Sequence, residues 1–155
     1  MKESAAITLV VLIGMTLLAA AQTKETDKSV EPASSKIQNL IAKLPVGSNH
    51  HLDVAYVPGT RPGSKPDSVQ TLDLYVPAGK GPFPLVFWIH GGGWHSGGQL
   101  ESGINLALKF LPKGFALASI NYRLTGDAPF PAQILDCNAA LAYLRHEAAG
   151  HRIDP

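Results

Sequence analysis

Three consecutive glycines, Gly91-Gly92-Gly93, stand between His90 and Trp94, directly after the apolar run 85–89. The length of that run and its β-branched and aromatic residues predict a buried strand. Glycine has no Cβ, so a turn at this point can adopt positive φ and direct backbone N–H groups toward a cavity. Such N–H groups suit an oxyanion, the charge that develops when a nucleophile attacks an ester or amide carbonyl. A plain flexible turn is the alternative, and the preceding strand with the flanking His90 and Trp94 favours the oxyanion loop.

The composition indicates an ordinary globular domain. The chain has 155 residues, 45% of them hydrophobic and 16% charged, which fits one packed domain. Its net charge of +1 comes without a basic block, so we expect no nucleic-acid partner. Cys137 is the only cysteine, which excludes an intrachain disulfide, and we expect it to pack as a small apolar residue. His50, His51 and His95 lack the spacing of metal ligands, so we expect no metal and no other cofactor.

The N-terminus is typical of an exported protein. Residues 1–21 combine a short positive start, an apolar run and the small residues Ala19-Ala20-Ala21, and they predict a cleaved signal peptide. An uncleaved membrane anchor is the alternative, but the apolar run is short for crossing a bilayer. We therefore expect a periplasmic or secreted protein with no stable membrane span after signal cleavage.

A polar linker and a short helix follow at residues 22–45. Ile37, Leu40, Ile41 and Leu44 recur at helical spacing, and Pro45 ends the pattern. We expect Ser34 or Ser35 to cap this helix, which would pack on the outside of the domain.

Residues 51–57 and 69–76 show the alternation of two antiparallel strands around a turn rich in glycine and proline. In the second strand Leu72, Leu74 and Val76 can face a core, and we expect Asp73 and Tyr75 to face outward.

The rest of the chain alternates between strands and helices. After the strand at 85–89, apolar residues at helical spacing predict a helix over 100–111, a strand over 115–122 and a helix over 134–148. Ile134, Cys137, Leu141, Leu144 and Ala148 form the expected buried stripe of the last helix. This order implies parallel strands joined by crossover helices, and hence an α/β fold with a mixed, mostly parallel sheet. Arg123 and Asp136 flank apolar segments and are expected to form a pair, with substrate binding by Arg123 as the alternative.

With these elements in place, the sequence resembles the α/β-hydrolase superfamily, and specifically the hormone-sensitive-lipase-like esterases and the acetyl- and feruloyl-esterase-like hydrolases. The matching motifs occur in the family's order: Leu72-Asp73-Leu74-Tyr75-Val76-Pro77, residues 84–94, Asn121-Tyr122-Arg123-Leu124, and Pro129-Phe130-Pro131-Ala132-Gln133 leading to Asp136-Cys137. The resemblance implies that residues 46–155 form the N-terminal part of an α/β-hydrolase domain. It also implies a serine carboxylic-ester hydrolase acting on a small-molecule or polysaccharide ester, although a peptidase-type relative uses the same oxyanion chemistry. The pattern specifies no oligomeric state.

The resemblance assigns roles within the glycine loop. It implies that Gly92 and Gly93 supply the oxyanion N–H donors, while Gly91 serves the turn. His90 is expected to hydrogen-bond the backbone and hold the loop, because the catalytic His of this fold comes last in the chain. Trp94 either borders the substrate pocket or packs against the following helix.

The nucleophile of the fold is missing from the pattern. It would lie in Gly-x-Ser-x-Gly, and no such motif occurs; around Ser96 the first glycine position holds Trp94. Ile153-Asp154-Pro155 resembles the lead-in to the next strand. We therefore expect a fragment truncated before the nucleophile elbow, inactive by itself because the Ser-Asp/Glu-His triad is absent. A short, non-catalytic or vestigial exported binding protein is the alternative.

Overall fold

The computed structural model describes residues 33–58, 69–101 and 103–154. In chain order these form α1 (Ala33–Ile41), β1 (Asn49–Ala55), β2 (Thr71–Val76), β3 (Leu85–Ile89), α2 (Ile104–Ala107), the 3-10 helix η1 (Leu108–Lys113), β4 (Ala116–Ile120), α3 (Ala132–His146) and α4 (Ala148–His151). The expected signal peptide and the first part of the linker lie outside the described residues. Within the described ranges, no helix is long and apolar enough to cross a membrane.

The four strands form one mixed sheet in the order β1-β2-β4-β3. β1 pairs with β2 and β2 with β4 in antiparallel fashion, whereas β3 and β4 are parallel. The expected α/β class, the antiparallel pair β1–β2 and the crossover from β3 to β4 are confirmed. Among the paired strands that the structure describes, the parallel pairing is limited to β3–β4, because β2 lies between β1 and β4 and runs antiparallel to both.

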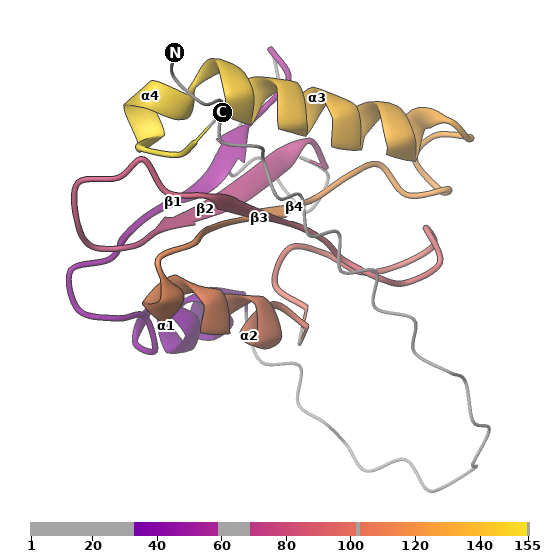
Figure 1. Ribbon diagram of the computed structural model, residues 1–155. Helices are drawn as coiled ribbons and strands as arrows, with labels where there is room; N and C mark the ends of the chain where they lie inside the picture. Colours follow the sequence, from indigo (N-terminus) through magenta and orange to yellow (C-terminus); the bar gives the residue numbers. More distant parts are fainter. Residues whose placement is uncertain (1–32, 59–68, 102, 155) are drawn as a thin grey trace, which may run out of the picture.

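Helices cover both faces of the sheet (Figure 1). α3 and α4 lie on one face, where Leu144 and Ala148 pack with Leu72 and Leu74 of β2. α1, α2 and η1 lie on the other face. The central strands β2 and β4 are therefore buried along their whole length.

Burial on both faces corrects the expectation that Asp73 and Tyr75 face outward. Both point away from the Leu72 face, as the alternation predicts, but each is 0% exposed. Tyr75 packs with Leu40 of α1 and Ile104 of α2 on that second face. The layer that covers them is formed partly by α1, the helix that we expected to pack on the outside of the domain.

Two helix details also differ from expectation. Ser34 and Ser35 lie inside α1, which begins at Ala33, so neither is its cap. The helix expected over 100–111 is divided into α2 and η1, because Pro112 has no N–H for an α-helical hydrogen bond, and Gly114 ends it with φ +84°.

The buried face of α3 was also predicted incorrectly at one end. Ile134 is 43% exposed, whereas Gln133 and Asp136 are buried. Both polar side chains find partners in the segment before the helix, Gln133 at the carbonyl of Ala128 and Asp136 at Arg123. These hydrogen bonds turn that face of the helix inward and leave Ile134 outside.

The end of the chain returns to the sheet beside β3. Ile153 forms a parallel bridge with Phe83, whose N–H donates to the carbonyl of Arg152 at 2.8 Å and whose carbonyl accepts the N–H of Asp154 at 2.8 Å. The bridge places Ile153 beside Phe83, and a further strand after these residues stays a prediction.

Gly103, just before α2, gives a test of the packing between α2 and the sheet. A Cβ at Gly103 would lie 2.5 Å from Cζ2 of Trp88, a rigid and buried ring. Gly103→Ala should therefore lower the free energy of unfolding by about 1–3 kcal/mol, the usual cost of overpacking. Urea unfolding measures the change, and Gly126→Ala, with nothing within 4 Å of its Cβ, is the matched control. Equal unfolding midpoints for the two variants would contradict this packing.

Candidate active site

The glycine loop follows β3 in a left-handed backbone conformation. φ is +114° at Gly92, +59° at Gly93 and +65° at Trp94. A Cβ on Gly92 would overlap the carbonyl oxygen of Ser96, whereas one on Gly93 would meet nothing within 4 Å. Gly92 is therefore required by close packing, and Gly93 only by its backbone angle.

Hydrogen bonds hold the loop on its carbonyl side. The carbonyl of Gly92 accepts the N–H of His95 at 3.0 Å, and that of Trp94 accepts the N–H of Thr125 at 2.8 Å. The Thr125 hydroxyl also contacts Nδ1 of His95 at 2.7 Å. Among the described residues, none accepts a hydrogen bond from the N–H of Gly92 or Gly93, and both glycines are exposed. The loop thus presents two backbone donors that a ligand oxygen can reach.

His90 holds the start of the loop, as expected. Its ring stacks on Tyr122 with centroids 4.3 Å apart, and its Nδ1 lies 2.8 Å from the carbonyl of Gly91. The Tyr122 hydroxyl donates to the carbonyl of His90 at 3.0 Å. Burial lowers the pKa of His90 below its usual value, which favours a neutral ring that donates from Nδ1 to Gly91.

Trp94 lies on the surface beside the loop. Its side chain is 45% exposed and its ring centroid is 6.2 Å from that of Phe130, which is 66% exposed. Phe130 comes from the segment before α3. The two rings form an exposed aromatic pair next to Gly93. Substrate binding by Trp94 stays a prediction.

The glycine loop extends from His90 to Gln99, and a buried polar cluster surrounds Gln99 at its far end. The Gln99 amide nitrogen donates to Oδ1 of Asp53 at 2.9 Å and to Oδ1 of Asp73 at 3.1 Å. Asp53 sits at an irregularity of β1 with φ +51°, and its N–H donates to Oδ1 of Asp73 at 2.9 Å. Burial raises the pKa of Asp73 to about 6, since hydrogen bonds from the Asp53 N–H and the Tyr75 hydroxyl offset only part of the cost of desolvation.

Sequence reasoning missed this cluster. A signal was present in the charged residues Asp53 and Asp73, which interrupt two apolar strands that we paired with each other. Gln99 directly follows Gly97-Gly98, and it carried no signal of its own.

The expected pair of Arg123 and Asp136 is confirmed. Arg123 donates from Nη2 to Oδ1 of Asp136 at 2.7 Å and from Nε to Oδ2 at 2.9 Å. Its backbone N–H also donates to Oδ2, and Gln70 donates to Oδ1 at 2.8 Å. Burial acts to raise the pKa of Asp136, but these hydrogen bonds outweigh it and hold that pKa below its usual value. The ion pair fixes the connection from β4 to α3, so the side chains of Arg123 and Asp136 have a structural role.

Cys137 packs against the core beneath α3, as expected for a small apolar residue. Burial raises the pKa of its thiol to about 11, which keeps it protonated. In the part of the chain that the structure describes, no three His, Cys, Asp or Glu side chains are placed to hold a metal ion.

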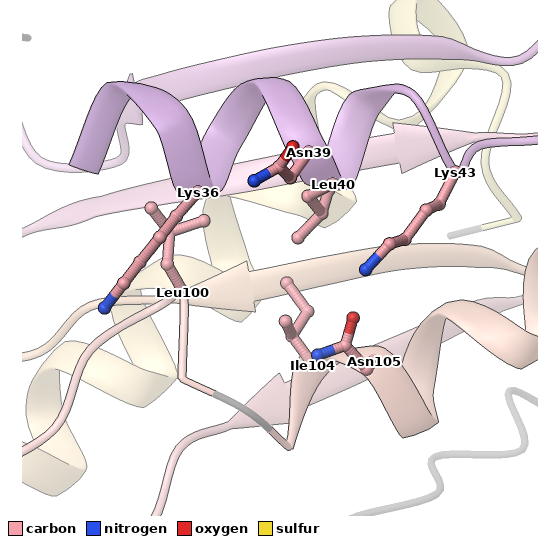
Figure 2. Close-up of a pocket in the computed structure, with 7 residues that line it drawn as sticks. All are labelled: Lys36, Asn39, Leu40, Lys43, Leu100, Ile104 and Asn105. Carbon is pink, nitrogen blue, oxygen red and sulfur yellow. The ribbon is translucent and has the colours of Figure 1, made fainter. Parts of the chain in front are cut away.

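A separate groove of about 270 Å³ lies between α1 and α2 (Figure 2). Leu40, Leu100 and Ile104 give it an apolar floor, and Lys36 and Lys43 extend from the α1 side. The full lining is Lys36, Asn39, Leu40, Lys43, Leu100, Ile104 and Asn105. Its lining contains no carboxylate, histidine, hydroxyl or thiol, and its ionisable side chains are Lys36 and Lys43.

A comparison with protein-family models decides the family of this chain. The model of the BD-FAE family matches residues 72–155, which is more than half of the sequence and includes the glycine loop. The chain belongs to the BD-FAE family. The expected resemblance to α/β-hydrolase esterases is therefore confirmed.

Relatives and solved structures that are named as esterases agree with this assignment. The carboxylic ester hydrolase LipN of Mycobacterium tuberculosis is 33% identical over 75 residues, which cover 48% of this chain and 20% of that protein. Esterase B from Lactobacillus rhamnosis superposes with a TM-score of 0.60 at 28% identity, over 79% of this chain and 38% of that one. A truncated carbohydrate esterase from gut microbiota gives a TM-score of 0.60 at 29% identity, over 69% and 36%.

The match covers only part of each relative. This BD-FAE chain spans about a fifth of the length of the curated relatives that it matches first. The fold and the esterase family are shared over that part.

The raised pKa of Asp73 predicts a pH-dependent stability. As pH falls, the folded chain takes up this proton near pH 6 and the unfolded chain only near its usual value of 3.8. The Asp73 carboxylate thus destabilises the folded chain above about pH 6, and that loss is recovered as pH falls toward 4. The lowered pKa of His90 acts in the opposite direction, since a buried neutral His favours unfolding as the pH falls.

Asp73→Asn isolates this carboxyl, because the contribution of His90 is common to both proteins. The free energy of unfolding of the wild type should gain about 2 kcal/mol relative to Asp73→Asn between about pH 7 and pH 4. Urea unfolding across this pH range measures the difference. A difference between the two proteins that is independent of pH would refute the raised pKa.

Proposed function

We propose that this chain supplies the oxyanion-binding part of a serine carboxylic-ester hydrolase. The observation that carries the proposal is the pair of N–H groups at Gly92 and Gly93, exposed and without acceptors among the described residues, at the carboxyl end of β3. Membership of the BD-FAE family and the esterase relatives support ester hydrolysis as the reaction.

The two donors would act on the charge that develops during the reaction. A serine Oγ attacks the ester carbonyl while a histidine takes its proton, and the carbonyl oxygen becomes an oxyanion. The N–H groups of Gly92 and Gly93 would bind this oxygen together with the N–H after the serine. Collapse of the intermediate returns the proton to the leaving alcohol, and water then releases the acid. In this proposal the serine, the histidine and the acidic residue follow Pro155 in a longer protein.

The substrate class is a small-molecule or carbohydrate ester. The relatives named as esterase B and as a carbohydrate esterase support this range. Trp94 and Phe130 would border the substrate beside the loop, because their exposed rings adjoin the two donors. The signal-like residues 1–21 favour export, so we place the substrate outside the cytoplasm.

The 155-residue chain by itself should not hydrolyse p-nitrophenyl acetate or butyrate above the rate of its Gly92→Ala variant, because it lacks the nucleophile motif. A spectrophotometric assay of the two purified proteins makes this test. Hydrolysis by the wild-type chain that Gly92→Ala abolishes would show that these residues already contain the nucleophile.

In the longer protein, Gly93→Ala should lower kcat for p-nitrophenyl acetate by about 10²-fold, as expected when one oxyanion donor is misdirected. The alanine has open space but an unfavourable φ, so the peptide must rotate to relieve the strain. Gly114→Ala is the matched control, since Gly114 also has positive φ, +84°, and open space but lies after η1. It should lose similar stability and keep its activity. Equal kcat for the two variants would remove Gly93 from the site.

A further inference from the structure

Both ends of the glycine loop are attached to the residues that end and follow β4. At the near end, the ring of His90 stacks on Tyr122. At the far end, the N–H of Gln99 donates to Oδ1 of Asn121 at 2.8 Å, and the Ser119 hydroxyl donates to the carbonyl of Gln99 at 2.8 Å. The backbone of Gln99 is thus held on both of its polar groups.

The side chain of Gln99 is also fully engaged. Its amide nitrogen donates to the carboxylates of Asp53 and Asp73, and its Oε1 accepts the Nδ2 hydrogen of Asn121 at 2.9 Å. The side chain is only 6% exposed. A carboxamide can donate to the two carboxylates and also accept a hydrogen bond from the Asn121 amide. Neither Leu nor an ionised Glu can provide this combination.

The two ends of the loop also pack against each other. A Cβ on Gly97 would overlap Nδ1 of His90 and lie 2.6 Å from the carbonyl oxygen of Gly91. One residue earlier, the carbonyl of Ser96 lies against Gly92. A displacement at Gln99 can therefore reach Gly92 through these two close contacts.

We propose that Gln99 is a positioning residue that fixes the far end of the glycine loop and so maintains the conformation of Gly92 and Gly93. The inference rests on the proposed oxyanion role for its catalytic meaning. Its structural content is the coupling between Gln99 and the loop, which can be measured without esterase activity.

The charges around Gln99 make the coupling sensitive to the chemistry of its side chain. The carboxyl groups of Asp53 on β1 and Asp73 on β2 face the amide, and the Tyr75 hydroxyl donates to the Asp73 carboxyl. The polar neighbours from β4 and the residue after it, Ser119 and Asn121, are neutral. A glutamate at position 99 would add a third carboxyl group to this cluster. When protonated it can donate one hydrogen bond and accept one, and when ionised it repels both carboxylates.

Hydrogen exchange of two amides reports the loop directly. The N–H of His95 is bonded to the carbonyl of Gly92, and that of Thr125 to the carbonyl of Trp94. Gln99→Leu should lower the protection factors of both by about tenfold or more, because local opening becomes easier. The amide of Ala116, bonded to the carbonyl of Pro84 in the sheet, should keep its protection and serves as the reference for the whole fold.

Gln99→Glu should give the pH signature that a merely structural role would not. Protection at His95 and Thr125 should be close to wild type at about pH 5 and lost by about pH 8, as the new carboxyl ionises. Gln38→Glu makes the same chemical change on the exposed side of α1 and should leave both amides unchanged at either pH. Ser119→Ala removes one hydrogen bond to the Gln99 carbonyl with little change in volume, and it should produce a smaller loss at the same two amides.

Two results would overturn the inference. The first is equal loss of protection at His95, Thr125 and Ala116 in both Gln99 variants, which would assign Gln99 to overall stability. The second is unchanged protection at the loop amides in both variants and in Ser119→Ala. Because exchange is independent of catalysis, an inactive longer protein with loop amides that respond as expected would refute the esterase proposal and leave the coupling intact.

Discussion

Complete burial of β4 is the constraint on which this structure depends. The strand pairs with β2 on one side and β3 on the other, and helices cover both of its faces. Every residue from Ala116 to Ile120 is 0% exposed. Small and apolar side chains meet this constraint, whereas the hydroxyl of Ser119 must find a partner. It does so at the carbonyl of Gln99, and this hydrogen bond ties the loop after β3 to the middle of the sheet.

The parallel pairing of β3 and β4 brings the glycine loop to the residues that follow β4. The carboxyl ends of parallel strands meet at one edge of a sheet, where open α/β folds place their binding sites. Here that edge joins residues 90–99 to residues 121–125 through His90 and Tyr122, Gln99 and Asn121, and Trp94 and Thr125. Within residues 121–125, Arg123 also forms the ion pair with Asp136, which fixes the position of the first turns of α3. One edge therefore organises both the site and the second helical layer.

The sequence predicted the parts of this arrangement that depend on local pattern. The strand followed by the glycines, the crossover to β4 and the Arg123–Asp136 pair all follow from periodicity and from the need of a charged residue for a partner. The burial of Asp73 and Tyr75 could not be predicted in this way, because alternation shows which face a residue takes and not whether a helix covers that face. The exposure of Ile134 has a similar cause, since the hydrogen bonds of Gln133 and Asp136 decide the orientation of α3.

The cluster around Gln99 required the tertiary structure. Its members come from β1, β2, the glycine loop and the residues around the end of β4. One of its hydrogen bonds joins Asp53 and Gln99, which are 46 residues apart. The irregularity in β1 that brings Asp53 to this cluster leaves no mark in the alternation of the strand. The roles of Gly92, Gly93 and Trp94 in catalysis stay predictions, and what the structure shows is a positive φ at each of the three residues.

The bridge between Ile153 and Phe83 has a consequence for the growth of the sheet. Among the described strands, β3 pairs only with β4, and the bridge lies on the other side of β3. Side chains of a strand alternate between two faces, and Ile153 is buried with the cluster beneath α3. The bridge therefore acts as a template: in any strand that continues from it, alternate residues counted from Ile153 face α3, and those between them face α2. A slip of one residue would exchange the two sets, so this single pair selects the register in which the apolar edge Leu85–Ile89 can be extended.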